Sequence, residues 1–203
     1  MKISFMLDSS VLSEASKPKP HPAVSAFLAA ADYVIAAGTL MEIQFGIAKI
    51  ADDNPEKAAR LADWYDDIVA SGTPIVETGQ EVARIWGRLA SDSRLNNLRV
   101  HHAGQRKFRA LQDLHIAAAA IANGSAIATI DVEDFMLIHR CHPLPGVYNP
   151  AADVWHAGDP VRACLRASTK ENSNIRRSVA DFLNADKAND DLVASPSRVL
   201  ADQ

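Results

Sequence analysis

Short apolar runs alternate with longer stretches of helical periodicity along the first part of the chain. Ile3 to Leu7 is an apolar run that ends in a charged residue, and it predicts a buried strand opening into a loop. Tyr33 to Ala37 predicts a second strand, and Gly38-Thr39 marks the start of a second helix. The apolar positions that recur at helical spacing are Val24, Phe27, Leu28 and Ala31, and then Leu40, Ile43, Ile47 and Ile50. The pattern predicts strand, helix, strand, helix.

Two further helices are marked by their end signals. Asn54-Pro55 places an N-cap residue before a proline at the first helical position, and an apolar stripe then runs to a stop near Gly72. Thr78 and Glu81 have the spacing of a capping box ahead of another apolar stripe. Trp64, Tyr65 and Trp86 lie on these stripes, so we expect them to pack rather than to bind a ligand.

The pattern resumes after a basic segment. Asp113 opens an alanine-rich helix that ends at Asn123-Gly124, and Ala126 to Ile130 predicts a strand that ends in Asp131. A last short strand surrounds Val147. Strands that alternate with helices predict an α/β fold, an α/β/α sandwich whose central parallel sheet is flanked by helices.

Composition adds a second region to this picture. The 203 residues are 48% hydrophobic and 23% charged, which suits one globular domain plus an appendage. We place the domain at residues 1–156 and a polar C-terminal extension, disordered or weakly helical, at residues 157–203.

The same composition excludes several classes of protein. The net charge of -4 argues against coating nucleic acid by charge alone. No apolar stretch approaches the roughly 18 residues that span a bilayer, and two cysteines do not make a disulfide framework. We expect a soluble, cytoplasmic protein that does not enter a membrane.

Four acidic residues stand where this fold gathers ligands. Asp8 and Asp131 follow strands, and Glu42 and Asp113 lie early in helices that leave the same sheet edge. Each also has a structural explanation: Thr39 and Glu42 match a capping box, and the aspartates suit helix N-termini. Carboxylates crowded together require protons or a cation, and oxygen ligands favour Mg²⁺ or Mn²⁺. We therefore predict a shared cation site.

Several motifs together resemble one known family. Leu7 to Glu14 (LDSSVLSE), followed by Lys17 to Pro22, resembles the opening of VapC-type toxins of the FitB-like branch of the PIN-domain family. Later segments resemble the remaining motifs of that family, in the expected order: Thr39 to Ile43 with Gly46-Ile47, Gln112 to Ala120, Thr129 to Phe135, and Val147 to Pro150.

The resemblance implies a PIN fold, Mg²⁺ or Mn²⁺, RNA cleavage and a cognate antitoxin. By motif position it implies Asp8, Glu42, Asp113 and Asp131 as the acidic cluster, with Ser9, Thr129 and Asp134 in support. Three features depart from the family. His115 and Ala119 replace a small residue and a threonine, which alters the mouth of the site. Asn149-Pro150 is not followed directly by tryptophan, and the chain extends past the usual family end.

Basic residues gather just before the third motif. A solvated loop is one interpretation and phosphate positioning is the other; because the segment leads into Asp113, we favour the second. The candidate RNA-binding residues are Arg94, Arg99, Arg106, Lys107 and Arg109. The spacing of His139, Cys141 and His142 is a weak zinc signal, and we assign no metal there.

Our hypothesis is phosphodiester hydrolysis, with Asp8 and Asp113 as direct cation ligands, and with Glu42 and Asp131 completing the site or orienting metal-bound water. Apolar helix faces in a domain of this size predict a homodimer. Two rivals stay open. One is a non-catalytic PIN-like module that binds an antitoxin or RNA. The other is a phosphatase of the HAD type, although Ser10 stands where that chemistry needs a second aspartate.

Overall fold

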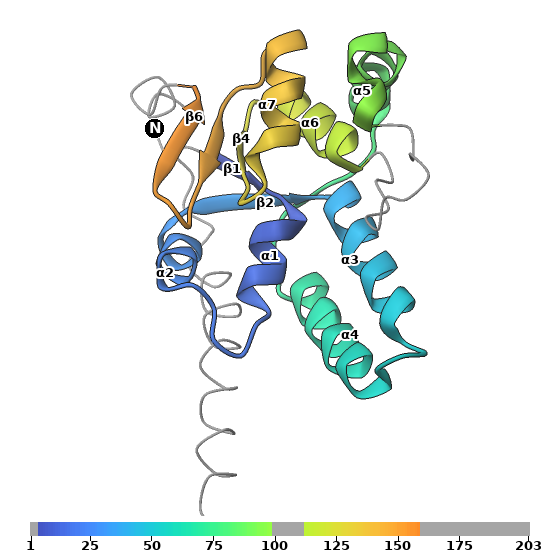
Figure 1. The fold of residues 1–203 in the computed structure, drawn as a ribbon, viewed down its shortest axis with the longest axis vertical. Coiled ribbons are helices and arrows are strands. Elements are labelled where there is room, and N and C mark those ends of the chain that lie inside the picture. The colour runs from blue at the N-terminus through green and yellow to red at the C-terminus, as the bar shows by residue number, and fades with distance from the viewer. Residues whose placement is uncertain (1–3, 99–111, 159–203) are drawn as a thin grey trace, which may run out of the picture.

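A six-stranded sheet lies at the centre of the computed structural model, which describes residues 4–98 and 112–158 (Figure 1). Within these residues the strand order is β3-β2-β1-β4-β5-β6. The strands are β1 (Ser4–Leu7), β2 (Asp32–Ala36), β3 (Ile75–Val76), β4 (Ala126–Ala128), β5 (Val147–Asn149) and β6 (Val154–Ala157). The helices are α1 (Ser9–Ala15), α2 (Pro22–Ala30), α3 (Ala37–Ile50), α4 (Pro55–Ala70), α5 (Gln80–Ser91), α6 (Gln112–Asn123) and α7 (Val132–Cys141), with a 3-10 helix η1 (Ser93–Leu98).

The first five strands are parallel. β1 pairs with both β2 and β4, β2 pairs with β3, and β4 pairs with β5. Helices connect these strands because parallel neighbours require a crossover from one end of the sheet to the other. β6 returns antiparallel to β5 and closes that edge of the described sheet. The predicted α/β/α sandwich is confirmed.

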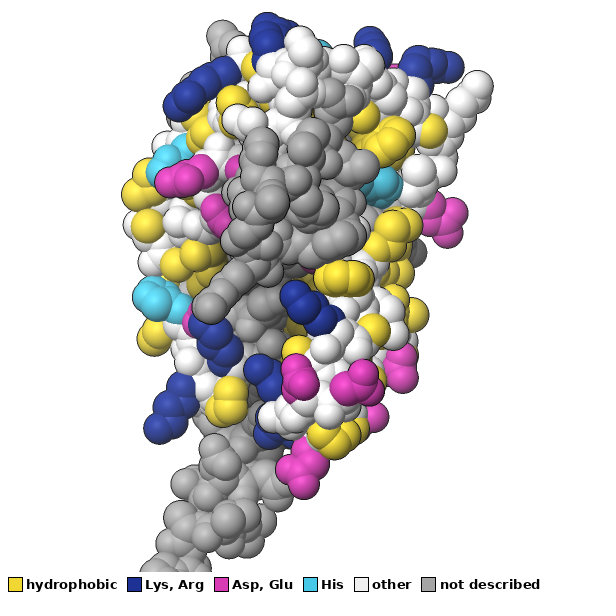
Figure 2. Space-filling model, turned by 45° about the vertical axis from the view of Figure 1, so that its right-hand side comes forward, with side chains coloured by type: hydrophobic (Ala, Val, Ile, Leu, Met, Phe, Trp, Pro, Cys, Tyr) yellow, Lys and Arg dark blue, Asp and Glu magenta, His cyan; other side chains and the backbone are white. Residues whose placement is uncertain are grey.

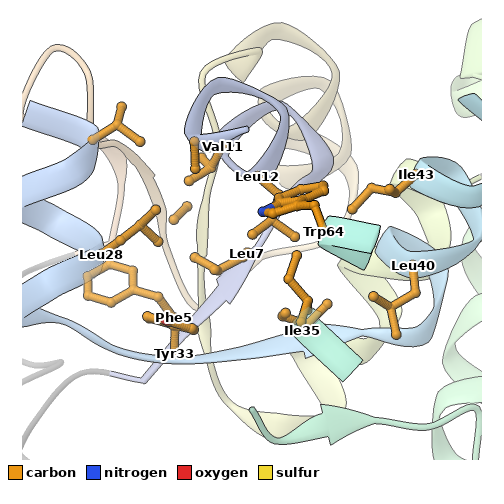
Figure 3. Packing of buried hydrophobic residues seen from close by; sticks show 14 of the residues in the cluster. Phe5, Leu7, Val11, Leu12, Leu28, Tyr33, Ile35, Leu40, Ile43 and Trp64 are labelled. Atoms are coloured by element: carbon orange, nitrogen blue, oxygen red, sulfur yellow. The ribbon is translucent and has the colours of Figure 1, made fainter. Parts of the chain in front are cut away.

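Alternating side chains of β1 face two separate hydrophobic layers. Phe5 and Leu7 lie in one layer, with residues of α1 to α4, and Met6 lies in the other, with residues of α5 to α7. This alternation follows from the two-residue period of a strand. Figure 3 shows side chains from α1, β1, β2, α3 and α4 gathered in the first layer. Both faces of β1 are therefore covered, and its carboxyl end is held between the layers.

One helix was not expected from the pattern. The sequence predicts a loop after Leu7, but α1 begins at Ser9, with Asp8 as its N-cap residue. The loop prediction is wrong because Ser9 and Ser10 suit the first turn of a capped helix as well as they suit a loop. Val11, Leu12 and Ala15 bury the inner face of α1.

The predicted helix ends agree with the structure in part. The side chain of Asn54 accepts a hydrogen bond from the backbone of Lys57, as an N-cap residue does. The predicted capping box of Thr78 and Glu81 is wrong. Gly79 holds the N-cap position of α5 without a side-chain hydrogen bond, and Thr78 instead contacts another helix.

β3 and β6 were not predicted either. β3 has two residues, which is too short to leave a pattern, and β6 alternates exposed and half-buried positions. Trp155 of β6 packs on Tyr148 and Phe5, with ring centroids 5.1 and 5.8 Å away. β6 runs to Ala157, one residue beyond the domain boundary predicted at residue 156. None of the described helices is long and apolar enough to cross a membrane.

Candidate metal centre

Asp8 stands at the carboxyl end of the central strand and is 3% exposed. Its backbone N–H donates to the carbonyl of Ala128 in β4 at 3.0 Å, which joins the ends of the two strands. Its Oδ2 accepts the Ser10 hydroxyl at 2.6 Å and the Ser10 backbone N–H at 3.3 Å. The carboxylate thereby caps α1, as an aspartate at the N-cap position commonly does.

Thr129, at the end of β4, makes the second hydroxyl contact to this carboxylate. Its Oγ1 donates to Oδ2 of Asp8 at 2.8 Å and lies 3.2 Å from the Ser10 hydroxyl. Ser10 also accepts the Ile130 N–H at 3.0 Å. Hydrogen bonds from Ser10 and Thr129 thus help to fix the orientation of Asp8. Thr129 was expected to support the site, but Ser10, which the sequence analysis did not select, makes the contact for which Ser9 was proposed.

Burial raises the pKa of Asp8 because it removes water from the charged form. Hydrogen bonds from Ser10 and Thr129 oppose this effect without cancelling it. A buried carboxylate of this kind is costly to ionise unless a positive charge is close. A bound cation would supply that charge.

Two more carboxylates converge on Asp8 from different helices. Glu42 lies in the second turn of α3, and Asp113 lies in the first turn of α6. One ligand oxygen from each of the three acids lies within 4.8 Å of the others. Oxygen-only ligands at this spacing fit a hard divalent cation such as Mg²⁺ or Mn²⁺.

The capping explanation of Glu42 is wrong. α3 begins at Ala37, so Thr39 lies inside the helix, and its hydroxyl donates to the Leu7 carbonyl at 2.9 Å. This bond ties α3 to the end of β1, next to Asp8. Glu42 therefore lies at the site and does not cap the helix.

Asp131 takes a different place from the other three acids. It is exposed at the N-cap position of α7 and makes no side-chain capping hydrogen bond. Its backbone N–H donates to Oγ1 of Thr129 at 3.0 Å. In the part of the chain that the structure describes, the convergent group contains Asp8, Glu42 and Asp113 and does not include Asp131. Asp134, the other proposed supporting acid, lies in the first turn of α7.

Of the candidate RNA-binding residues, the structure describes only Arg94. The others, Arg99, Arg106, Lys107 and Arg109, lie outside the described residues. Arg94 bonds Asp92 through Nε at 3.0 and 3.1 Å and through its terminal nitrogen at 2.6 Å. This pairing holds the pKa of Asp92 well below its usual range. The guanidinium is already engaged by a carboxylate, which weakens the argument for phosphate binding.

The histidines near Cys141 also have structural partners. Nε2 of His142 lies 2.9 Å from Asp92, and Nδ1 of His139 accepts the Leu144 N–H at 3.0 Å. These contacts join the end of α7 to its neighbours.

His115 is a further residue close to the site. It lies two positions after Asp113 on α6, and its Nε2 is 2.7 Å from the Thr78 hydroxyl. Burial lowers the pKa of this histidine. The signal in the sequence was a lone histidine within an alanine-rich helix, where the resembling family has a small residue.

Comparisons with known proteins agree with this geometry. The family profile of the PIN domain matches residues 5–135. Ribonuclease VapC14 from Mycobacterium tuberculosis (strain CDC 1551 / Oshkosh) is 33% identical over 70 residues, which are 33% of this chain and 68% of that protein.

Two solved structures resemble this fold. One is VapBC2 from Rickettsia felis bound to a DNA fragment from their promoter: 20% identity, TM-score 0.50, covering 72% of this chain and 98% of the other. The other is FitAcB from Neisseria gonorrhoeae: 22% identity, TM-score 0.50, covering 72% and 97%. At these identities the likeness concerns the fold alone.

Proposed function

The chain belongs to the PIN-domain family, and on that premise we propose that it is a metal-dependent endoribonuclease that hydrolyses RNA phosphodiester bonds. We infer that Mg²⁺ or Mn²⁺ is its cofactor. The supporting observation is the meeting of three carboxylates, from the end of β1 and from α3 and α6, within 4.8 Å of one another.

The alternative, that the acids serve only as helix caps, explains less of the structure. Asp8 does cap α1. However, Glu42 lies beyond the first turn of α3, and Asp131 makes no side-chain capping bond. Helix capping alone does not explain why three carboxylates lie together, because their mutual repulsion makes that arrangement unfavourable without a counter-charge.

Each part of the site has a separate task in this proposal. Asp8 and Asp113 bind the cation, and Glu42 completes the ligand set. When bound, the cation supplies Lewis-acid stabilisation of charge on the phosphate and activation of water. Ser10 and Thr129 keep Asp8 oriented. Asp131 lies exposed at the rim of the site, outside the set of three ligands. Rigid holding of this kind contributes to catalysis because the ligands need no rearrangement when substrate arrives.

We also propose that the protein is the toxin of a toxin-antitoxin pair, acts in the cytoplasm and pairs with a cognate antitoxin protein. The name of the similar ribonuclease, VapC14, supports this proposal. Met41 and Phe45 of α3 and Val69 of α4 are exposed apolar residues, with 54%, 42% and 45% exposure. The face that brings α3 and α4 forward carries apolar side chains beside acidic ones (Figure 2). Such a surface suits a protein partner, the antitoxin or a second copy in a homodimer.

Cleavage of a defined RNA pool by the purified full-length chain tests the proposal. We expect fragments in Mg²⁺ or Mn²⁺ and none in EDTA, and mapping their 5′ ends identifies the cleaved sequence. Asp8→Asn and Asp113→Asn should abolish cleavage with an unchanged circular dichroism spectrum. Asp63→Asn, which removes an exposed acid from α4, is the control and should cleave normally. Metal-independent cleavage, or normal rates in the first two variants, would overturn the proposal.

A further inference from the structure

Helices α3 and α6 approach each other closely at one glycine. A Cβ atom placed on Gly38 would lie 2.5 Å from Nδ1 and 2.9 Å from Cγ of His115. Real Cβ atoms do not come so near another heavy atom, so the imidazole occupies the space that a side chain at residue 38 would need. Gly38 is not among the described glycines with positive φ, so its backbone conformation does not require glycine. The position requires glycine because a side chain there would have no room.

The same imidazole joins a third segment. Its Nε2 is 2.7 Å from the hydroxyl of Thr78, just before α5. Its Nδ1 is shielded from solvent and has no hydrogen-bond partner within residues 4–98 and 112–158. The ring is therefore held by Thr78 at one nitrogen and by packing on α3 at the other.

This contact lies beside the candidate metal ligands along both helices. Glu42 follows Gly38 by four residues, so the two share a face of α3. Asp113 precedes His115 by two residues on α6. Any change in the separation of the helices at Gly38 and His115 is thus passed to the two carboxylates, because packed helices move as stiff units.

We propose that His115 is a positioning residue, whose ring, seated on Gly38 and bonded to Thr78, sets the spacing between Glu42 and Asp113 for cation binding. This inference rests on the proposed metal-dependent function. It assigns His115 no contact with substrate or cation. It differs from a purely structural role because it links the contact to affinity for the metal as well as to stability.

Two glycines on α3 provide a matched experiment. Gly38→Ala places a methyl group against His115, whereas a Cβ on Gly46 would meet nothing within 4 Å. Mn²⁺ affinity of the full chain would be measured by isothermal titration calorimetry, and melting in EDTA would be measured separately. We expect Gly38→Ala to weaken Mn²⁺ binding about tenfold or more, as errors in ligand placement do. Gly46→Ala should bind Mn²⁺ as the wild type does.

A double variant isolates the contact. His115→Ala should itself weaken Mn²⁺ binding, and adding Gly38→Ala to it should change the affinity less than about twofold, since the ring that the methyl group displaces is gone. Equal effects of Gly38→Ala in both backgrounds would overturn the proposal. So would wild-type Mn²⁺ affinity in Gly38→Ala or His115→Ala, even with a lower melting temperature in EDTA, because that result describes a purely structural role.

If the wild type itself bound no Mn²⁺, the proposed function would fail rather than the positioning role. Crystal structures of the wild type and of Gly38→Ala then decide the inference. A wider separation of the Glu42 and Asp113 carboxylates in the variant supports it, and an unchanged separation overturns it.

Discussion

The hydroxyl of Ser10 lies 2.6 Å from Oδ2 of Asp8, on the same oxygen that Thr129 approaches at 2.8 Å. Ser10 comes from the first turn of α1, and Thr129 directly follows β4. The carboxylate at the centre of the site is therefore oriented by a helix and a strand that are more than a hundred residues apart. Its orientation depends on tertiary structure rather than on the local turn alone.

Removal of the Ser10 hydroxyl should loosen Asp8. We expect Ser10→Ala to weaken Mn²⁺ binding by about tenfold, the lower end of the range for residues that orient metal ligands. It should lower the free energy of unfolding by about 1 to 3 kcal/mol, because the Ser10 hydroxyl donates to Asp8 and also accepts the Ile130 N–H, which would lose that partner. Ser9→Ala is the control, because its hydroxyl is not among the described bonds to Asp8. Isothermal titration calorimetry that gave equal affinities for the two variants would contradict the assignment.

The contribution of Asp8 to the stability of the metal-free protein should fall as pH rises. Folding raises the pKa of Asp8 above its ordinary value of 3.8, so the folded state holds this proton more tightly than the unfolded state does. The contribution of Asp8 to the free energy of unfolding then falls as pH increases from 3.8 through the raised pKa. Asp8→Asn keeps the N-cap and lacks this titration.

Urea denaturation of both metal-free proteins, from about pH 4 to about pH 8, measures the effect. The stability of Asp8→Asn relative to the wild type should increase with pH. A difference that stays constant or decreases would show that burial does not penalise the Asp8 carboxylate.

Asp131 should matter less to cation binding than Asp113 does. It is exposed and lies outside the group of three convergent carboxylates. We expect Asp131→Asn to retain Mn²⁺ affinity within about threefold, since an exposed charge is well screened by water and salt. Asp113→Asn should lose most binding. If the two variants lost affinity equally in calorimetric titrations, Asp131 would have to be a direct ligand.

A chain that ends at Gly158 should fold and cleave RNA. It keeps β6, whose Trp155 packs on Tyr148 with ring centroids 5.1 Å apart, and it omits a segment with few apolar residues to bury. A chain that ends at Pro150 removes β6 and should melt at a lower temperature. If the chain that ends at Gly158 showed no cooperative melting transition in differential scanning calorimetry, residues 159–203 would belong to the folding unit.

The main strands and helices follow from the sequence because burial imposes periodicity. Phe5, Met6 and Leu7 are covered on both faces of β1 and are accordingly all apolar, and α3 buries the predicted Leu40, Ile43 and Ile47. The structure has the helix α1 where the sequence predicted a loop after Leu7. A helix of seven residues is too short to show a clear helical period in the sequence. β3 and β6 depend on edge pairing, which leaves little sequence signal.

Three of the four predicted acids, all but Asp131, converge in the structure. Thr129 was predicted as support for Asp8, whereas Ser10 was not. Residues at the ends of parallel strands must meet at one edge, which indicated Asp8 and its neighbours. Whether Ser9 or Ser10 reaches Asp8 depends on where α1 begins, because successive helical residues point about 100° apart. The false capping box at Thr78 has a similar cause: the hydroxyl bonds to His115, a partner 37 residues away.

The increase in Tm caused by a bound cation tests the shared cation site independently of any RNA substrate. A ligand that binds only the folded state adds about 2.7 kcal/mol at a hundredfold excess over Kd. For a chain of this size, each kcal/mol corresponds to roughly 2 to 4 °C in Tm. Mn²⁺ should therefore raise the Tm of the wild type by several degrees.

The decisive measurement is differential scanning calorimetry of the wild type, Asp113→Asn and the control Asp63→Asn, each with EDTA and with millimolar Mn²⁺. In EDTA, Asp113→Asn should melt no lower than the wild type, because one repelling charge is gone. With Mn²⁺ it should lose most of the increase in Tm that the wild type and the control both show. Equal increases in all three proteins would contradict a cation site shared by Asp8, Glu42 and Asp113.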